Sequence, residues 1–170
     1  AYLFGGLLAP VFLATHEGAK PYARAMMYLV EMRAGAFPVT MFSDSVFGAG
    51  AAFPLFYPPL AYTVAGLMQW ALGDPALGVN VAAFVAVLAS AFFMRHLLLD
   101  MGAPRAWAMI AAVAYISAPY RFGLLYTRGA LAESFALVWF PLVVLGIWKC
   151  TRHRGYPTLL VASAALALLS

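Results

Sequence analysis

Apolar residues occur in long runs along this chain, and short polar, Gly-rich or Pro-rich segments separate them. Residues 76 to 94, 106 to 118 and 131 to 148 are the clearest of these runs. In lipid, backbone groups find hydrogen-bond partners only within a helix or a closed barrel, and these runs lack the alternation of barrel strands. The pattern therefore predicts an all-α fold, a polytopic helical membrane protein.

Two shorter apolar runs lie at the ends of the chain, residues 1 to 15 and residues 158 to 170. Because a bilayer core takes about 20 residues, we interpret the first run as the exit half of a span. Together with the last run, this gives about five spanning segments in a single transmembrane domain of residues 1 to 170. Runs at both ends suggest that the sequence is the N-terminal part of a longer chain.

The longest polar segment covers residues 16 to 60. Its first part has a polar and an apolar stripe at helical spacing, which predicts a helix over residues 20 to 33 at the membrane surface. The stripes are Lys20, Arg24, Tyr28 and Glu31, and Tyr22, Ala25, Leu29 and Met32. Gly and Pro residues then predict a loop up to Pro59. Residues 60 to 73 are too short for an upright span, so we expect a juxtamembrane helix that does not cross.

Charge sets the expected topology. The chain is 65% hydrophobic and only 9% charged, with mean hydropathy +0.90 and a net charge of +4. Basic residues follow the runs that end near residues 94 and 148, and the positive-inside rule places both groups in the cytoplasm. Parity then places residues 16 to 75 and 119 to 130 on the extracytoplasmic face. The basic excess is thereby explained without nucleic acid, and we expect a multi-pass protein of the cell inner (plasma) membrane with membrane lipid as its surroundings.

Glu17 is the first candidate for chemistry, because it directly follows an apolar run and stands next to His16. Ionisable groups at a membrane face are costly unless they are solvated or paired. Glu17 is therefore either a solvated helix end paired with Lys20, a general base, or a carboxylate ligand of a divalent metal ion. Asp44 has the same two functional interpretations, and its structural alternatives are an Asx-turn or the N-cap of a short helix. A zinc site at His16 lacks an accompanying His/Cys cluster.

Two arginines, Arg121 and Arg128, lie on the expected outer side. Arginine forks bind phosphate oxygens bidentately, so a phosphate headgroup is one interpretation of this pair. An ion pair between Arg128 and Glu133 is the alternative. Tyr126 lies close by in sequence, and Tyr57 belongs to an aromatic cluster that reads either as an interfacial belt or as an entrance for a lipid tail.

Several segments resemble one family. The segments HEG, GAFP, FGAGAAFPLFYPPLAY and SAPYRFGLLYTRGALAES are similar to those of the glycosyltransferase C superfamily, in the branch labelled 6-pyruvoyl-tetrahydropterin-synthase-related. The resemblance implies a multi-span enzyme that takes a sugar from a polyprenyl-phosphate carrier at the extracytoplasmic face. It also implies an acidic residue in the first external loop, at the position of Glu17, where this branch more often has Asp.

We therefore expect a membrane glycosyltransferase with a polyprenyl-phosphate-linked sugar donor. Glu17 or Asp44 would deprotonate the acceptor, and the two arginines would stabilise the leaving phosphate. The expected substrate site also includes His16, Tyr57, Tyr126 and Glu133, and a divalent metal ion is considered as a cofactor. The alternatives are a non-catalytic subunit bound to partner subunits of a membrane complex, and a lipid or solute transporter, which uncharged span interiors disfavour.

Overall fold

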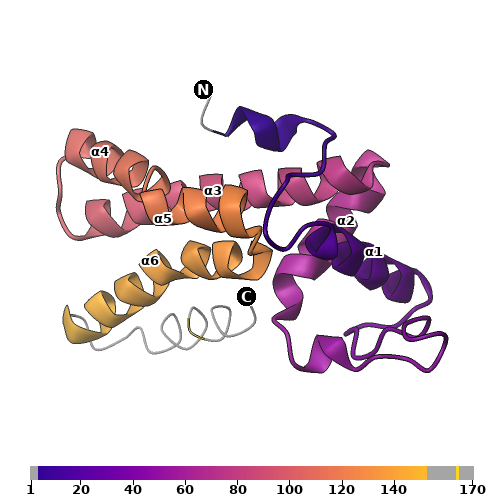
Figure 1. The fold of residues 1–170 in the computed structure, drawn as a ribbon. Helices are drawn as coiled ribbons and strands as arrows, with labels where there is room; N and C mark the ends of the chain where they lie inside the picture. Colours follow the sequence, from indigo (N-terminus) through magenta and orange to yellow (C-terminus); the bar gives the residue numbers. More distant parts are fainter. Residues whose placement is uncertain (1–3, 153–163, 165–170) are drawn as a thin grey trace.

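The computed structural model describes residues 4 to 152 and residue 164, and its regular elements are helices (Figure 1). Five of them are α-helices of 12 residues or more: α1 (Lys20–Arg33), α2 (Pro59–Leu72), α3 (Pro75–Asp100), α4 (Arg105–Ile116) and α6 (Leu131–Arg152). Shorter elements are the 3-10 turns Gly5–Leu8 and Phe53–Leu55, the single turn α5 (Pro119–Phe122) and the π-helical stretch Gly123–Arg128. The predicted all-α fold is confirmed for this part of the chain. The last apolar run, apart from residue 164, lies outside the described residues.

Within the described residues, three helical segments are long and apolar enough to cross a membrane: Pro75–Asp100, Arg105–Arg128 and Leu131–Arg152. They support a membrane protein, but five spans are not confirmed. The first of them begins sharply, because Asp74 accepts a 2.6 Å hydrogen bond from the Leu77 N–H and a proline stands at the first helical position. The other two segments pack against α3 (Figure 1).

The first expected span is not helical over most of its described length. Its only helical turn is Gly5–Leu8, and an extended chain follows. Pro10 cannot continue a helix, and the carbonyl groups released there find another partner. The Asn80 amide donates to the carbonyl oxygens of Ala9, at 3.0 Å, and Val11, at 2.8 Å. A side chain of α3 thus replaces the helical hydrogen bonds that a span would have made.

The second long helical segment continues beyond the apolar run of residues 106 to 118. The helix breaks only briefly before Pro119, and α5 and the π-helical stretch then continue to Arg128. It ends at Gly129, whose φ of 74° is left-handed. One polar residue of this stretch is enclosed by packing, since Arg121 is only 1% exposed.

Helix α1 has the predicted bounds, but its faces differ from the prediction. The expected polar stripe is largely buried, because Tyr28 stacks against Tyr62 of α2 and Glu31 accepts hydrogen bonds from the N–H and hydroxyl of Ser43. The outward face is apolar and contains Met26, Met27 and Val30. Helix α2, with 14 residues, is not among the segments long enough to cross.

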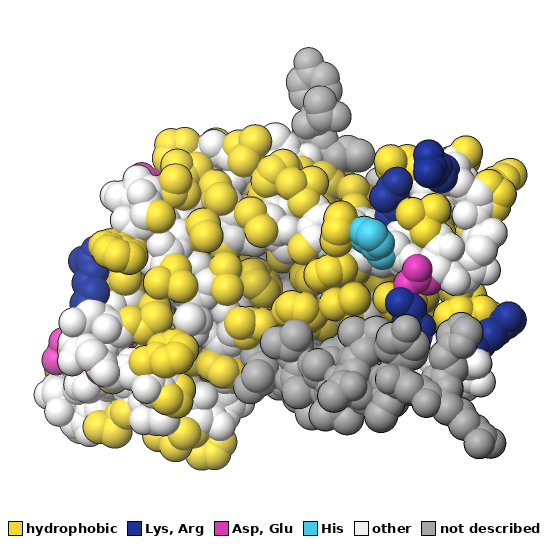
Figure 2. All heavy atoms as spheres, turned by 180° about the vertical axis from the view of Figure 1, so that it is seen from behind, with side chains coloured by type: hydrophobic (Ala, Val, Ile, Leu, Met, Phe, Trp, Pro, Cys, Tyr) yellow, Lys and Arg dark blue, Asp and Glu magenta, His cyan; other side chains and the backbone are white. Residues whose placement is uncertain are grey.

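The charged residues gather at the two ends of the long segments. At one end, the Lys149 ammonium lies 2.8 Å from the Asp100 carboxylate; we call residues 95 to 105 and 149 to 152 the opposite end. At the other, residues 16 to 73 meet residues 127 to 133, and we call this the α1 end. Figure 2 shows one face of the molecule, on which hydrophobic side chains fill the middle and charged side chains lie toward both ends.

Candidate functional site

The candidate site is built on a junction between two segments far apart in sequence. The His16 N–H donates to the Thr127 carbonyl at 2.8 Å, and the Glu17 N–H donates to the Arg128 carbonyl at 2.9 Å. Gly129 permits this approach, because a Cβ there would lie only 2.9 Å from the Cβ of Thr15. The segment after the N-terminal run is thereby fixed to the end of the second long helical segment, Arg105–Arg128.

The Glu17 carboxylate faces Arg24 rather than Lys20. Its Oε2 atom lies 3.7 Å from Nη1 of Arg24, with side chains that are 31% and 21% exposed, respectively. Contact with Lys20 is made by the backbone, since the Lys20 N–H donates to the Glu17 carbonyl. The carboxylate is therefore both accessible to solvent and oriented by a cation, as a general base for an acceptor hydroxyl requires. The His16 side chain beside it is exposed.

Arg24 is the site residue that sequence reasoning missed. Its guanidinium carbon lies 4.5 Å from the ring centroid of Phe53, 4.9 Å from that of Tyr57 and 6.0 Å from that of Tyr62. Its Nη1 also donates a 3.3 Å hydrogen bond to the Tyr62 hydroxyl. We call these three rings the aromatic cage. Helical spacing within α1 carries no signal for rings contributed by Phe53–Leu55, the following loop and α2, although the Phe/Tyr density of that stretch was visible.

The cage keeps Arg24 charged. Burial by itself would lower the pKa of the guanidinium, but the hydrogen bond to Tyr62, with the nearby oxygens of Tyr62, Tyr57 and Glu17, outweighs burial and leaves this pKa raised. Burial raises the pKa of Tyr62, and its contact with Arg24 offsets part of that rise. Tyr62 therefore remains a neutral hydroxyl that accepts from Arg24 at physiological pH.

Arg128 forms the ion pair that sequence analysis left as an alternative. Its two terminal nitrogens donate to the two carboxylate oxygens of Glu133 at 2.8 and 2.7 Å, and the side chains are 55% and 44% exposed. The Tyr120 hydroxyl donates to the same carboxylate at 3.5 Å. Arg128 thus lies at the junction with Glu17, but its charge is balanced by a neighbour.

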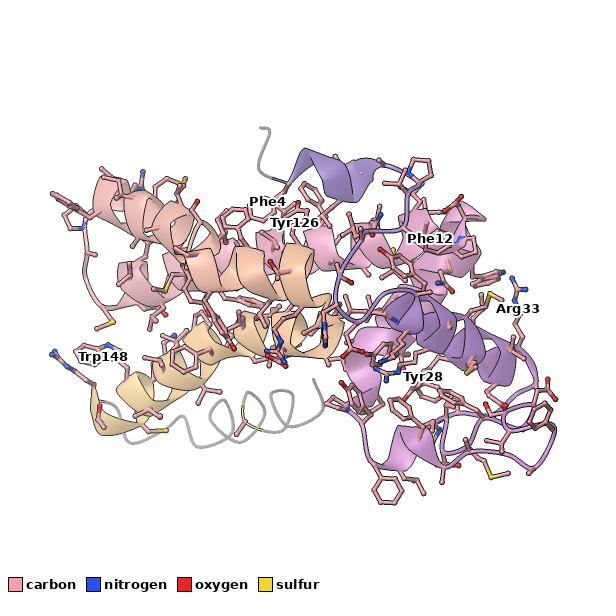
Figure 3. All side chains as sticks on the ribbon, viewed as in Figure 1. Phe4, Phe12, Tyr28, Arg33, Tyr126 and Trp148 are labelled. Atoms are coloured by element: carbon pink, nitrogen blue, oxygen red, sulfur yellow. The ribbon has the colours of Figure 1, made fainter. Side chains whose placement is uncertain are left out.

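Arg121 and Tyr126 do not lie on an open surface facing Glu17. The Arg121 guanidinium is enclosed, 5.2 Å from the ring of Tyr115, and its nitrogens make no hydrogen bond of normal geometry. Tyr126 stacks on Phe122 at 6.2 Å, and Phe122 stacks on Phe4 at 5.3 Å. Figure 3 shows Phe4 and Tyr126 close together beneath the N-terminal turn. Both residues therefore take part in the aromatic packing of the second long segment, Arg105–Arg128.

No family model, curated protein or solved structure matches the chain. The site is therefore interpreted from its own chemistry.

Asp44 lies away from Glu17. It is exposed and lines a hollow with Met27, Val30 and Glu31 in the second half of α1. About ten helical residues separate this place from the start of α1, or roughly 15 Å at 1.5 Å per residue. The structure thus does not bring the two predicted carboxylates together, and the described residues contain no group of three or more His, Cys, Asp or Glu side chains arranged for a metal ion.

Proposed function

We propose that this chain belongs to a membrane glycosyltransferase that uses a polyprenyl-phosphate-linked sugar donor, and that the reaction takes place at the α1 end. The observation that supports this most is the junction of His16 and Glu17 with Thr127 and Arg128. It joins a solvent-accessible carboxylate to a neighbourhood with two arginines, Arg24 and Arg128. Sugar transfer from a lipid phosphate needs such a set, a base for the acceptor hydroxyl and cations for the charge that develops on the leaving phosphate.

Glu17 is the proposed base. Its carboxylate is one-third exposed, so an acceptor hydroxyl can reach it, and Arg24 at 3.7 Å restricts its orientation. When the acceptor oxygen attacks the anomeric carbon, Glu17 takes the hydroxyl proton and the bond from that carbon to the phosphate oxygen breaks. Phosphate leaves without needing a second, protonated carboxyl group, unlike the leaving alcohol of glycoside hydrolysis.

Arg128 is proposed to contact the phosphate after exchanging its partner. An exposed ion pair such as Arg128 with Glu133 is worth only about 0.2–1 kcal/mol. A phosphate can therefore replace the Glu133 carboxylate at small cost, with the same bidentate geometry. Arg121, enclosed in the same helical segment, would contribute a fixed positive charge rather than a direct contact. His16 and Tyr57, which border Glu17 and Arg24, would bound the substrate space.

We further propose that the α1 end faces the extracytoplasmic side of the inner membrane. At the α1 end, basic and acidic residues are equal in number, four of each. At the opposite end the described residues include four basic side chains but only Asp100 as an acid, and they lie at helix ends next to a short turn. This excess of positive charge in short connections favours a cytoplasmic location for the opposite end.

The test is transfer by the full-length protein in proteoliposomes supplied with a polyprenyl-phosphate-linked sugar. Glu17→Gln is expected to lower the transfer rate by about two to three decades, the usual contribution of a general base, while the protein stays folded. Asp44→Asn is the matched control and should leave the rate unchanged. Unchanged transfer by Glu17→Gln would remove Glu17 from the mechanism. A divalent ion on Glu17 remains a prediction, which addition of EDTA to the same assay tests.

A second candidate is a non-catalytic subunit of a membrane complex. The observation that favours it is the mutual neutralisation of Arg128 and Glu133, which needs no substrate. Exposed apolar loop side chains, such as Phe47 and Phe56, would then contact partner subunits. Purification of the chain in a stable, stoichiometric complex that transfers no sugar would support this second function over the first.

A further inference from the structure

Arg24, Arg121 and Arg128 differ in how many of their guanidinium N–H groups are free to bind a ligand. Both terminal nitrogens of Arg128 are taken by Glu133, and Arg121 is enclosed. Arg24, in contrast, uses only Nη1, in a 3.3 Å hydrogen bond to Tyr62 and the 3.7 Å contact with Glu17. Among the described residues nothing accepts from its Nε and Nη2, and these atoms are not sealed from solvent. Arg24 therefore has one edge of its fork available to an anion.

The aromatic cage fixes the direction of that edge. Phe53 and Tyr57 lie within 5 Å of the guanidinium carbon, at distances typical of cation–π contacts. A guanidinium held by rings and one hydrogen bond loses little further freedom when it binds an anion, because its planar fork is already oriented. An exposed lysine or arginine on a flexible side chain would lack this advantage.

An apolar groove begins at the same cage. Tyr57, one of its rings, also lines a hollow of about 490 Å³, within the range of roughly 300–1,000 Å³ usual for ligand sites. Apart from Thr40, its other walls are apolar or proline, with Val39, Leu55 and Phe56 among them. Leu55 and Phe56 are 63% and 84% exposed, which leaves large apolar surfaces uncovered beside a cation. This combination matches a ligand with an anionic head and an apolar chain.

We propose that Arg24 binds the phosphate of an isoprenoid or fatty-chain phosphate whose chain occupies the groove beside Tyr57. The inference rests on the proposed function and places the donor's phosphate on Arg24 first. Nε and Nη2 donate to two phosphate oxygens in a charge-assisted, bidentate arrangement, while Nη1 stays beside Glu17. One guanidinium then holds the base and the leaving group on two of its edges.

Binding of three probes to the full-length protein in nanodiscs of zwitterionic lipid tests the inference. The probes are farnesyl phosphate, the neutral alcohol farnesol, and inorganic phosphate. Arg24→Gln should weaken farnesyl phosphate by about 10- to 100-fold, the usual effect of removing a hydrogen bond to a charged group. The affinity for farnesol should change by less than about twofold. The matched control is Arg33→Gln, which removes the same charge from the far end of α1, where Arg33 points outward (Figure 3); it should leave all three affinities unchanged.

Several results would overturn the inference. The first is an unchanged affinity of Arg24→Gln for farnesyl phosphate. The second is an equal loss of affinity in Arg33→Gln, which would mean that binding depends on general surface charge. If inorganic phosphate binds as tightly as farnesyl phosphate, the groove does not hold a chain. If Arg24→Gln lowers the melting temperature strongly, Arg24→Lys replaces it in the test. That variant keeps the charge but loses the bidentate fork, so a threefold or greater loss is expected and no loss contradicts the inference.

Binding and transfer separate this inference from the proposed function. Farnesyl phosphate binding that depends on Arg24, with no sugar transfer by the wild-type protein, would keep the site and remove the glycosyltransferase. Sugar transfer that depends on Glu17, with lipid phosphate binding unaffected by Arg24→Gln, would keep the proposed glycosyltransferase and remove the phosphate site at Arg24.

Discussion

Charge is arranged differently at the two ends of this molecule. At the α1 end most charged side chains have a partner across two elements: Glu17 with Arg24, Arg128 with Glu133, and Glu31 with the N–H and hydroxyl of Ser43. At the opposite end Asp100 pairs with Lys149, and Arg152 lies over the ring of Trp148 at 4.3 Å. One end is thus balanced in charge and internally connected, and the other carries an excess of positive charge.

The difference separates two uses of charge in a membrane protein. Basic side chains in short connections suit a topological role, which needs charge but no defined geometry. The α1 end also has backbone hydrogen bonds between residues 16–17 and 127–128, which need defined geometry. They lie near an oriented carboxylate and an oriented guanidinium beside an apolar groove. The comparison supports the proposals that place a site at the α1 end and a topological role at the opposite end.

The largest expected effect contrasts two left-handed glycines, one at each end. Gly129→Ala should lower the free energy of unfolding by about 2–5 kcal/mol, since it adds left-handed strain of about 1–2 kcal/mol and overlap with Thr15. Gly102 has a φ of 87° and open space around it, so Gly102→Ala should lower the free energy of unfolding only by the cost of the left-handed strain. Unfolding by SDS in mixed micelles measures both. Equal losses would mean that the junction with Thr15 is not tightly packed.

The next contrast is between two carboxylates. Glu31 is 8% exposed and accepts two hydrogen bonds, so Glu31→Gln should cost about 1.5–3 kcal/mol of unfolding free energy. Asp100 is paired at the surface, and Asp100→Asn should cost about 0.2–1 kcal/mol. Unfolding by SDS in mixed micelles measures both variants. A larger loss of unfolding free energy for Asp100→Asn would contradict the idea that the α1 end is the internally connected one.

Sequence patterns predicted the helix over 20 to 33 and the long apolar segments, because amphipathic spacing and apolar length are local properties. They failed at residues 4 to 15, where Asn80 satisfies the carbonyl groups of an extended chain. The apolar run of residues 106 to 118 gave too short a second segment, because the helical segment extends to Arg128 and encloses Arg121. Both differences depend on packing between elements, which local sequence patterns do not show.

The candidate site was predictable to a similar extent. Glu17 follows from its place after an apolar run, and its neighbourhood with Arg128 agrees with the parity argument. Asp44 carried the same local signal, yet it lies along α1 away from Glu17. Arg24 could not be distinguished from other surface basic residues, because its cage is formed by rings roughly thirty to forty positions later in the sequence.

The buried Tyr28 hydroxyl at the α1 end should have a smaller effect on stability, and this effect should depend on pH. Its hydroxyl is buried without a hydrogen bond, so Tyr28→Phe should raise stability by on the order of 1 kcal/mol at pH 7. Burial, with a lesser contribution from Tyr62, raises the pKa of Tyr28 to about 12. The folded state therefore keeps a proton that the unfolded state loses above pH 10, and stability falls as pH rises from 10 to 12. Thermal unfolding at pH 7 and at pH 11 to 12 should show a smaller alkaline loss of stability for Tyr28→Phe than for the wild type, and an equal loss would contradict the assignment to Tyr28.

The smallest expected effect concerns the Arg128 and Glu133 pair. A double-mutant cycle with alanine at both positions should give a coupling of about 0.2–1 kcal/mol that decreases with salt, as for exposed pairs. A coupling above about 2 kcal/mol would mean that Glu133 is not easily displaced. The proposed contact of Arg128 with phosphate would then be wrong, and the balanced pair would be a structural feature.

The most direct measurement is an experimental density map of the full-length protein in nanodiscs with farnesyl phosphate added. We predict a phosphate about 2.7–2.9 Å from the Nε and Nη2 atoms of Arg24, the distance of charge-assisted hydrogen bonds, with the chain in the groove beside Tyr57 and the Glu17 carboxylate facing the same space. A phosphate bound instead among Arg95, Arg105 and Arg152 at the opposite end would contradict the assignment of the site to the α1 end.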